Sequence, residues 1–308
     1  METKLIKLYQ KRSFGDKLQD TVDFVRDNWR PLLKYITYLL LPVTLVQTFF
    51  MNNFMSGYMS FSTSLGGAKP ELESMLPWLS SMGWTMLVQY VGIVLLVALT
   101  YTMMQLYEQR PRLTGITWAD LQPGVKRMAL RQLLLILTGL ALCVAAALMI
   151  AILIAFGPAM IVLGVMLLLI AMPLFALVTP IYLFENTGIV AAYAKSIRLG
   201  WKTWAGIVAV TFVLYLLVSI IQGVVSMPGY LMMGIKQALA LQGNSTGFAT
   251  SFGYSAAQYL LGVVSGFVGN CLLVLPFVGL AYQYGHACDK VDGVSVDRDI
   301  EQFETLNA

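Results

Sequence analysis

The sequence predicts an all-α integral membrane bundle of six transmembrane helices, with amphipathic helices at the cytoplasmic interface. Its 308 residues are 58% apolar and only 12% charged, whereas a soluble domain carries roughly 25% charged residues. Several uncharged stretches exceed the about 20 residues that a helix needs to cross a bilayer. Between them, four short segments hold 18 of the 20 Lys and Arg residues. This clustering beside apolar spans argues against nucleic acid as a partner, despite the net charge of +4.

The uncharged stretches divide into six spans. The longest, from Gln132 to Phe184, is too long for one helix, and Gly157-Pro158 near its middle is a turn signal. The last stretch begins with a polar, Gly- and Ser-rich segment and supplies one span after it. The predicted helices lie near 35–51, 84–107, 132–156, 159–184, 205–226 and 256–284.

The basic residues predict the orientation of these spans. The N-terminal tail carries eight Lys and Arg, the 108–131 loop five, the 185–204 segment three and the C-terminal tail two. Only Lys69 and Lys236 remain for the opposite side. Because short cytoplasmic loops hold the excess of Lys and Arg, both termini are predicted to be cytoplasmic. We expect a cytoplasmic tail with an amphipathic helix at 1–34, a transmembrane domain at 35–284 and a cytoplasmic tail at 285–308, with no cleavable signal peptide.

An amphipathic helix is predicted before the first span. Apolar residues recur at spacings of three and four and so share one helical face; they are Phe14, Leu18, Val22, Val25 and Trp29. The opposite side carries Asp16, Asp20, Asp23 and Asp27. Ser13 lies three residues ahead of Asp16 and is the expected N-cap.

The spans suggest three hairpin repeats. Every second span ends in a similar string: Q-L-Y-E-Q at 105–109, Y-L-F-E-N at 182–186 and Y-Q-Y-G-H at 282–286. An amphipathic segment also precedes the fifth span, and 119–131 is a weaker copy. The alternative is that any three hairpins with both ends inside would show exits in which aromatic residues precede charged ones, because aromatic residues favour the interface.

The segment from Glu185 to Trp204, with Pro180 before it, resembles a motif of bacterial membrane proteins related to the membrane domain of glycerophosphoryl diester phosphodiesterases. The matching positions are Glu185, Gly188, Ile189, Ala192, Ser196, Leu199 and Trp204. The pattern at 29–33, Trp-Arg-Pro-Leu-Leu, also resembles this group, particularly its uncharacterised members from Bacteroidetes. The resemblance implies a multi-pass protein of the cell inner membrane. It does not imply phosphodiesterase activity, since that chemistry needs clustered carboxylates and His, and the chain has one His.

Glu185 has two interpretations. An ionisable group inside a membrane is by default a functional candidate. A carboxylate at the start of the following helix is also stabilised by the exposed amides and the helix dipole, and it would pair with a basic residue such as Arg127 or Arg131. We favour the structural interpretation, for Glu185 and for Glu108 one repeat earlier.

Lys195, Arg198 and Lys202 form a cationic stripe that is a candidate contact for anionic lipid headgroups. The alternative is that the stripe only keeps an interfacial helix flat on the membrane.

Small residues at spacings of four in the sixth span predict close helix packing; they are Gly262, Ser265, Gly266 and Gly269. We favour packing within one chain over a dimer face. Pro173, Pro180 and Pro276 lie inside spans and are expected to kink them.

The central parts of the six spans contain no Asp, Glu, Lys, Arg or His, although proton- and ion-coupled carriers usually place such groups there. No catalytic triad, metal-ligand or phosphate-loop pattern is present, so we expect no enzyme activity, no metal and no cofactor. The 17 Met residues are interpreted as apolar filler. His286 with Cys288 and Asp289 is interpreted as interfacial sequence.

The predicted function is that of a non-catalytic inner-membrane scaffold, regulator or assembly partner of envelope components. Its expected partners are membrane lipids and an envelope protein. The alternative is a transporter or flippase for an uncharged or lipidic substrate, which would move along the kinked fourth and sixth spans.

Overall fold

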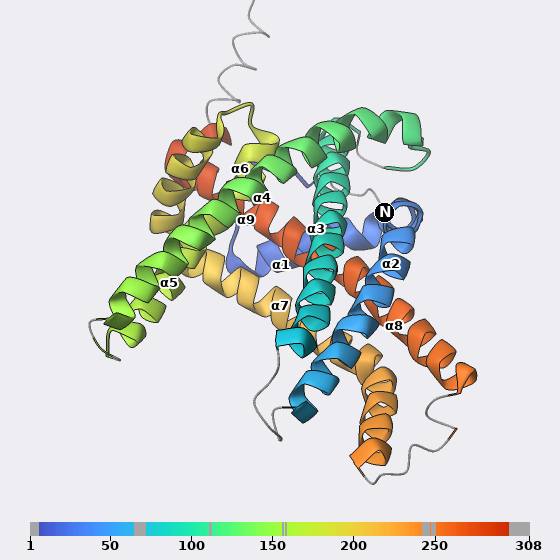
Figure 1. Ribbon diagram of the computed structural model, residues 1–308. Coiled ribbons are helices and arrows are strands. Elements are labelled where there is room, and N and C mark those ends of the chain that lie inside the picture. The colour runs from blue at the N-terminus through green and yellow to red at the C-terminus, as the bar shows by residue number, and fades with distance from the viewer. Residues whose placement is uncertain are drawn as a thin grey trace, which may run out of the picture. The chain divides into compact units, whose positions relative to one another are not determined.

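A computed structural model describes residues 6–64, 72–110, 113–155, 157, 159–241, 247 and 251–295. These residues are almost entirely helical and include no strand. The helices are α1 (Phe14–Asp27), α2 (Trp29–Ser64), α3 (Leu72–Gln109), α4 (Trp118–Ala155), α5 (Ala159–Ala176), α6 (Val178–Phe184), α7 (Ile189–Leu241), α8 (Phe252–Leu272) and α9 (Val274–Asp292), as Figure 1 shows.

Six segments among the described residues are long and apolar enough to cross a membrane, which confirms the predicted all-α membrane bundle. They are Trp29–Tyr58, Met75–Gln109, Trp118–Leu153, Val162–Phe184, Ile189–Leu239 and Phe252–Asp292. Most extend beyond the predicted limits, because those limits followed the absence of charge. A helix forms its own backbone hydrogen bonds whatever the charge of its side chains, so it continues through a charged turn with these bonds intact.

Proline explains two interruptions of these spans. The fourth span breaks at Leu177, between α5 and α6, and the sixth breaks at Leu273, between α8 and α9. Each break lies three residues before a proline, Pro180 or Pro276. A proline removes one helical hydrogen bond and clashes with the carbonyl four residues earlier. Pro173, in contrast, lies inside the continuous α5.

Two further local predictions are confirmed. Ser13 is the N-cap of α1, where its hydroxyl accepts from the Asp16 amide at 3.2 Å and the Asp16 carboxylate accepts from the Ser13 amide at 3.0 Å. These reciprocal bonds form a capping box. The turn between α4 and α5 contains Gly157 at φ +125°, a conformation that glycine adopts most readily.

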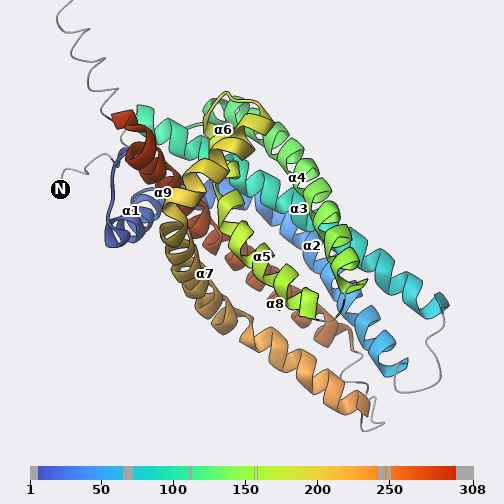
Figure 2. The same ribbon diagram turned by 90° about the vertical axis from the view of Figure 1, so that its left-hand side faces the viewer.

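The helices form two compact units, which we describe separately. The first contains residues 1–32, 97–216 and 274–308. Within it α9 packs against α1 and α6, and Figure 2 shows α1 beside α9. Gly279 permits this packing, because a Cβ there would overlap Leu214 of α7 and lie 3.4 Å from Thr21 of α1.

The second unit contains residues 33–96 and 217–273. Here the small residues of α8 lie on two faces. A Cβ at Gly262 or Gly266 would lie 2.7 Å from Thr48 or 3.0 Å from Thr44, both on α2. On the other face, a Cβ at Gly269 would lie 3.1 Å from Gln222 of α7.

Ser265 extends this second face through hydrogen bonds. Its hydroxyl accepts from Gln222 Nε2 at 2.9 Å and shares a proton with the Ser226 hydroxyl at 2.6 Å. Asn270 Nδ2 donates to Thr44 Oγ1 at 3.0 Å. The small residues singled out in the sequence are therefore used within the chain, between α8 and its two neighbours.

Candidate functional site

Glu185 lies at the centre of a polar cluster in the first unit. It follows the last residue of α6 in extended conformation (φ −93°, ψ 146°), and its amide donates to the carbonyl of Ile181. Its Oε1 accepts from Lys195 Nζ at 2.6 Å and from the Tyr284 hydroxyl at 2.5 Å. The two charged side chains are only about one-fifth exposed, 20% for Glu185 and 24% for Lys195. The carboxylate thus joins the start of α7 to α9.

This geometry corrects the expected role of Glu185 as a cap of the following helix. That helix begins at Ile189, and among the described residues the carboxylate is bound by the α7 and α9 side chains instead of by backbone amides. The carboxylate reaches α7 through the side chain of Lys195, six residues after the first residue of the helix.

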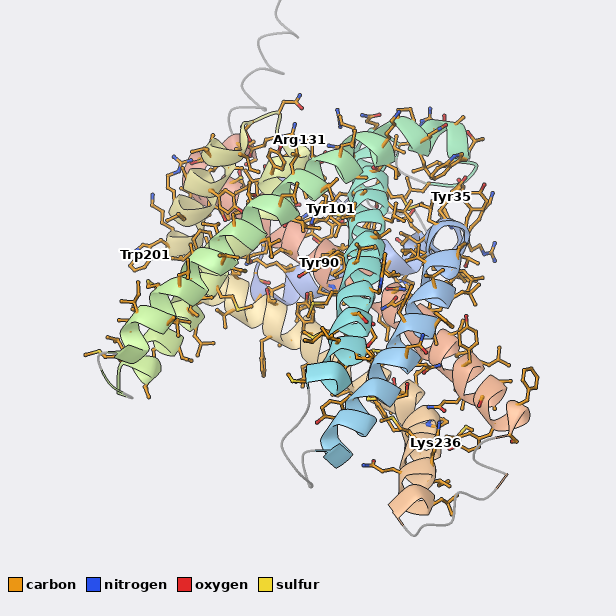
Figure 3. The ribbon with its side chains drawn as sticks, viewed as in Figure 1. Tyr35, Tyr90, Tyr101, Arg131, Trp201 and Lys236 are labelled. Atoms are coloured by element: carbon orange, nitrogen blue, oxygen red, sulfur yellow. The ribbon has the colours of Figure 1, made fainter. Side chains whose placement is uncertain are left out.

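The side chain of Arg131 of α4, labelled in Figure 3, binds the backbone of the connection between α6 and α7. One guanidinium nitrogen donates to the carbonyls of Glu185 at 3.0 Å and Thr187 at 2.9 Å. The guanidinium also lies over the Tyr182 ring, 4.2 Å from its centroid. Arg127, the other expected partner, donates to Gln105 instead, at 3.1 Å.

The remaining motif residues lie mostly where the first part of α7 meets α5. The Ser196 hydroxyl donates to the Leu174 carbonyl at 2.7 Å, and Trp204 Nε1 donates to the Ile170 carbonyl at 3.1 Å. Ala192 and Leu199 are fully buried. Gly188 lies in the connection before α7 with open space around it. Gly200 also belongs to this contact, because a Cβ there would lie 2.9 Å from the backbone of Leu174.

The cationic stripe divides into paired and unpaired members. Lys195 is held by Glu185, and its Nζ also lies 3.9 Å from Asp292. Arg198 donates to both carboxylate oxygens of Asp292 at 2.9 Å. Lys202 is exposed and forms no ion pair with any described residue. The geometry therefore leaves Lys202 as the stripe residue available to a lipid headgroup.

The N-terminal segment before α1 crosses α9 beside this cluster. Arg12 holds this segment in place. Its guanidinium forms an ion pair with Asp20 at 2.6 Å and donates to the carbonyls of Lys7, Leu8 (2.9 Å) and Gln10 (3.3 Å). Its Cζ also lies 4.7 Å from the centroid of the Tyr282 ring, within cation–π distance.

The three exit strings of the predicted repeats meet around this segment. The Leu8 amide donates to Glu108 Oε1 at 3.3 Å. A Cβ at Gly285, the position aligned with Glu108 and Glu185, would overlap the Leu8 carbonyl. The residue before each aligned position is aromatic, and the Phe184 and Tyr284 rings stack at 6.2 Å. The exit strings are therefore close in space as well as similar in sequence.

His286, Cys288 and Asp289, at the exit of the last span, are not arranged to ligate a metal ion. The Arg12 amide donates to His286 Nδ1 at 3.0 Å, and the Ser295 amide donates to Asp289 Oδ1 at 2.9 Å. Cys288 is buried as a free thiol. No group of three His, Cys, Asp or Glu suitable for a metal ion occurs among the described residues.

Burial changes the acidity of two groups in the N-terminal region. Lys17 of α1 is 5% exposed, and burial, followed by the positive charges of Lys290 and Arg12, lowers its pKa to about 8. Tyr9 shares a hydrogen bond with the Tyr284 hydroxyl at 3.1 Å, and burial raises its pKa to about 12. Tyr9 is therefore a neutral phenol at physiological pH and unsuited to act as a base.

The sequence did not identify Arg12, Tyr9, Tyr284 or Asp292 as members of this cluster. Their partners lie about 100 to 275 residues away in the chain. The one available signal was the alignment of the exit strings, which places Tyr284 at the position of Phe184.

Comparison with known proteins identifies no relative: no family model matches, and neither curated proteins nor solved structures give a match. The fold defines a polytopic α-helical membrane protein.

The Glu185–Lys195 pair should couple the two side chains more strongly than the Arg198–Asp292 pair does. We expect Glu185→Gln and Lys195→Met to give a coupling free energy of about 1–2 kcal/mol in a double-mutant cycle, because both groups are mostly buried. The cycle of Arg198→Met and Asp292→Asn is the control: Arg198 is 55% exposed, so its coupling should stay below about 1 kcal/mol. Thermal unfolding in one detergent measures both, and equal couplings would contradict the structural role of Glu185.

Proposed function

We propose that the protein is a non-catalytic scaffold of the bacterial inner membrane, which regulates or helps to assemble other envelope components. The observation that carries this proposal is the closure of the Glu185 cluster. Lys195 and Tyr284 bind the Glu185 carboxylate, and Asp292 binds Arg198. A catalytic acid or base must reach a substrate, whereas these groups bind one another and join α4, α7 and α9.

The distribution of Lys and Arg supports a cytoplasmic position for this cluster and for both termini. Two helical segments at that end offer contact surfaces. The exposed apolar residues include Phe14 and Val22 on α1 and Trp29 at the start of α2, at 44–53% exposure. On the first part of α7, Val190 and Trp201 are exposed by 78% and 70%.

These exposed faces fit helices that lie at the membrane surface, with one Trp just after α1 and another near the end of the first part of α7. The first part of α7 ends at Thr203, whose φ of −126° and ψ of 20° interrupt the helix before the span continues. Lys202, next to this break, is exposed, which supports it as the proposed contact for an anionic headgroup. Lipids are thus the proposed immediate partners, and an envelope protein is the proposed further one.

The alternative function is transport or flipping of an uncharged or lipidic substrate. One observation favours it: a groove of about 810 Å³ with mostly apolar walls runs between α4 and α5. The groove lies along the third and fourth spans, whereas the sequence suggested a path along the fourth and sixth.

Reconstitution into vesicles distinguishes these functions. A fluorescent phospholipid and a membrane-impermeant quencher report the rate at which lipid crosses the bilayer. For a scaffold we expect the same rate as in protein-free vesicles, and isolation of the protein in native-membrane nanodiscs should yield an envelope protein in near-stoichiometric amount. Accelerated lipid exchange without such a partner would overturn the scaffold proposal and favour the alternative.

A further inference from the structure

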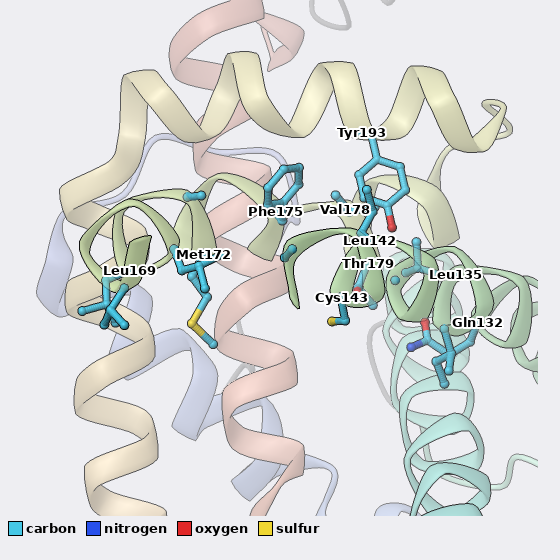
Figure 4. Close-up of a pocket in the computed structure, with 16 residues that line it drawn as sticks. Gln132, Leu135, Leu142, Cys143, Leu169, Met172, Phe175, Val178, Thr179 and Tyr193 are labelled. Carbon is cyan, nitrogen blue, oxygen red and sulfur yellow. The ribbon is translucent and has the colours of Figure 1, made fainter. Parts of the chain in front are cut away.

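The groove between α4 and α5 belongs to the first unit and is not used by the Glu185 cluster. Its lining comes from α4, α5, α6 and the first part of α7. Figure 4 shows Gln132, Thr179 and Tyr193 toward one end, and Leu169 and Met172 toward the other. The groove is thus polar at one end and apolar along the rest of its length.

The polar end contains an unsatisfied amide. Gln132 is 6% exposed, and its Oε1 is buried without a hydrogen-bond partner among the described residues. Leaving a buried acceptor without a donor destabilises the protein, so such an atom beside a groove points to a ligand that donates a hydrogen bond. Tyr193 adds a hydroxyl, which lies 3.3 Å from that of Thr138.

The dimensions of the groove suit one lipid chain. Its volume of about 810 Å³ lies within the roughly 300–1,000 Å³ of ligand sites. Along α4 the lining extends from Gln132 to Ala146, about 21 Å at 1.5 Å per residue. One leaflet of the hydrocarbon core is about 15 Å deep, half of the full thickness. A chain anchored at Gln132 therefore remains in the groove for the whole depth of its leaflet.

The position of the polar end also matches a lipid. Gln132 directly follows Arg131, the last charged residue before the uncharged stretch. That places the amide near headgroup depth, with the apolar lining deeper in the membrane. A polar, water-soluble ligand does not fit this groove, because most of its polar groups would face apolar side chains.

We propose that this groove binds one membrane phospholipid with an ammonium headgroup, with an acyl chain along α4 and α5 and the ammonium donating to Gln132 Oε1. The amide oxygen needs a donor, which the ammonium supplies and the ester groups do not. The proposal does not depend on the scaffold function, since a bound lipid stabilises a membrane protein whether or not the lipid is moved.

Gly139 provides a variant that fills the groove without disturbing the fold. It lines the groove, and a Cβ there meets no atom within 4 Å. Leucine also has a higher helix propensity than glycine. Gly223→Leu in α7 is the matched control, because Gly223 has equally open surroundings and lies outside the groove.

Native mass spectrometry of the detergent-washed protein, followed by back-titration with phosphatidylethanolamine, tests the proposal. We expect one retained phospholipid per wild-type chain and per Gly223→Leu chain, and at least a tenfold weaker affinity for Gly139→Leu. Gln132→Leu should weaken binding about tenfold, the factor for one hydrogen bond of about 1.4 kcal/mol.

Three results would overturn the proposal: no retained lipid in the wild type, equal retention by both glycine variants, or unchanged affinity of Gln132→Leu. The vesicle experiment separates this outcome from that of the proposed function. If the wild type exchanges lipid and Gly139→Leu abolishes the exchange, the scaffold function is contradicted but the lipid site in the groove is supported. If the wild type retains a lipid without exchanging it, both proposals are supported.

Discussion

Replacing Arg12 with methionine is expected to lower the free energy of unfolding by about 3–5 kcal/mol, the range for breaking a buried ion pair from one side. The Arg12 side chain is 2% exposed and lies 2.6 Å from Asp20. It also binds the carbonyls of Leu8 and Gln10. Methionine keeps the aliphatic volume but leaves a carboxylate and these carbonyls without their donor.

Arg26→Met is the matched control for this loss. Arg26 also pairs with an aspartate of α1, Asp23, at 2.8 Å, but its side chain is 69% exposed. Exposed pairs typically contribute 0.2–1 kcal/mol, so its loss should fall in about that range. Thermal or denaturant unfolding in one detergent compares the two variants, and similar losses would show that the N-terminal segment is not fixed by Arg12.

Gly285→Ala is expected to displace the N-terminal segment from α9. A Cβ at this position would overlap the Leu8 carbonyl oxygen and lie 2.8 Å from its carbon, and backbone atoms cannot yield as a flexible side chain does. Overpacking of this kind costs about 1–3 kcal/mol. Limited digestion with trypsin should therefore cleave after Lys11 or Arg12 several times faster than in the wild type.

Gly223→Ala controls for the change of residue type. Its Cβ meets no atom within 4 Å, so the substitution should leave cleavage unchanged and raise helix stability by up to about 1 kcal/mol. Wild-type cleavage rates in Gly285→Ala would contradict the close crossing of the two segments.

The spans, the Ser13 cap and the breaks before Pro180 and Pro276 were predictable because each depends on local sequence. Hydrophobicity identifies a span, and a cap or a proline acts within one turn of helix. The same kind of pattern fixed the turn at Gly157. These features need no knowledge of which helices are neighbours.

The buried side of α1 could not be predicted in this way. Its buried residues are Lys17, Thr21 and Phe24, while the apolar residues Phe14 and Val22 are exposed. In a membrane protein an apolar face has no reason to turn inward, because lipid is as apolar as the interior. Helix packing then depends on small and polar residues, whose partners are distant in the chain.

The orientation of Glu185 was unpredictable for the same reason. Its position before a helix predicts that the carboxylate accepts from the first backbone amides of that helix. In the structure it accepts from the side chains of Lys195 on α7 and Tyr284 on α9. Only the folded chain brings the hydroxyl of Tyr284, 99 residues away, to its carboxylate.

The hydrogen bond from the Arg12 amide to His286 can form only after α9 has been synthesised. These residues are 274 positions apart, so at about 5–20 residues per second the ribosome needs roughly 14–55 seconds to deliver the second after the first. During this interval the N-terminal segment has no α9 to cross, and its basic residues stay accessible to water and to anionic headgroups. The crossing of the N-terminal segment over α9 is therefore a late step of folding, which follows the synthesis of the last helix.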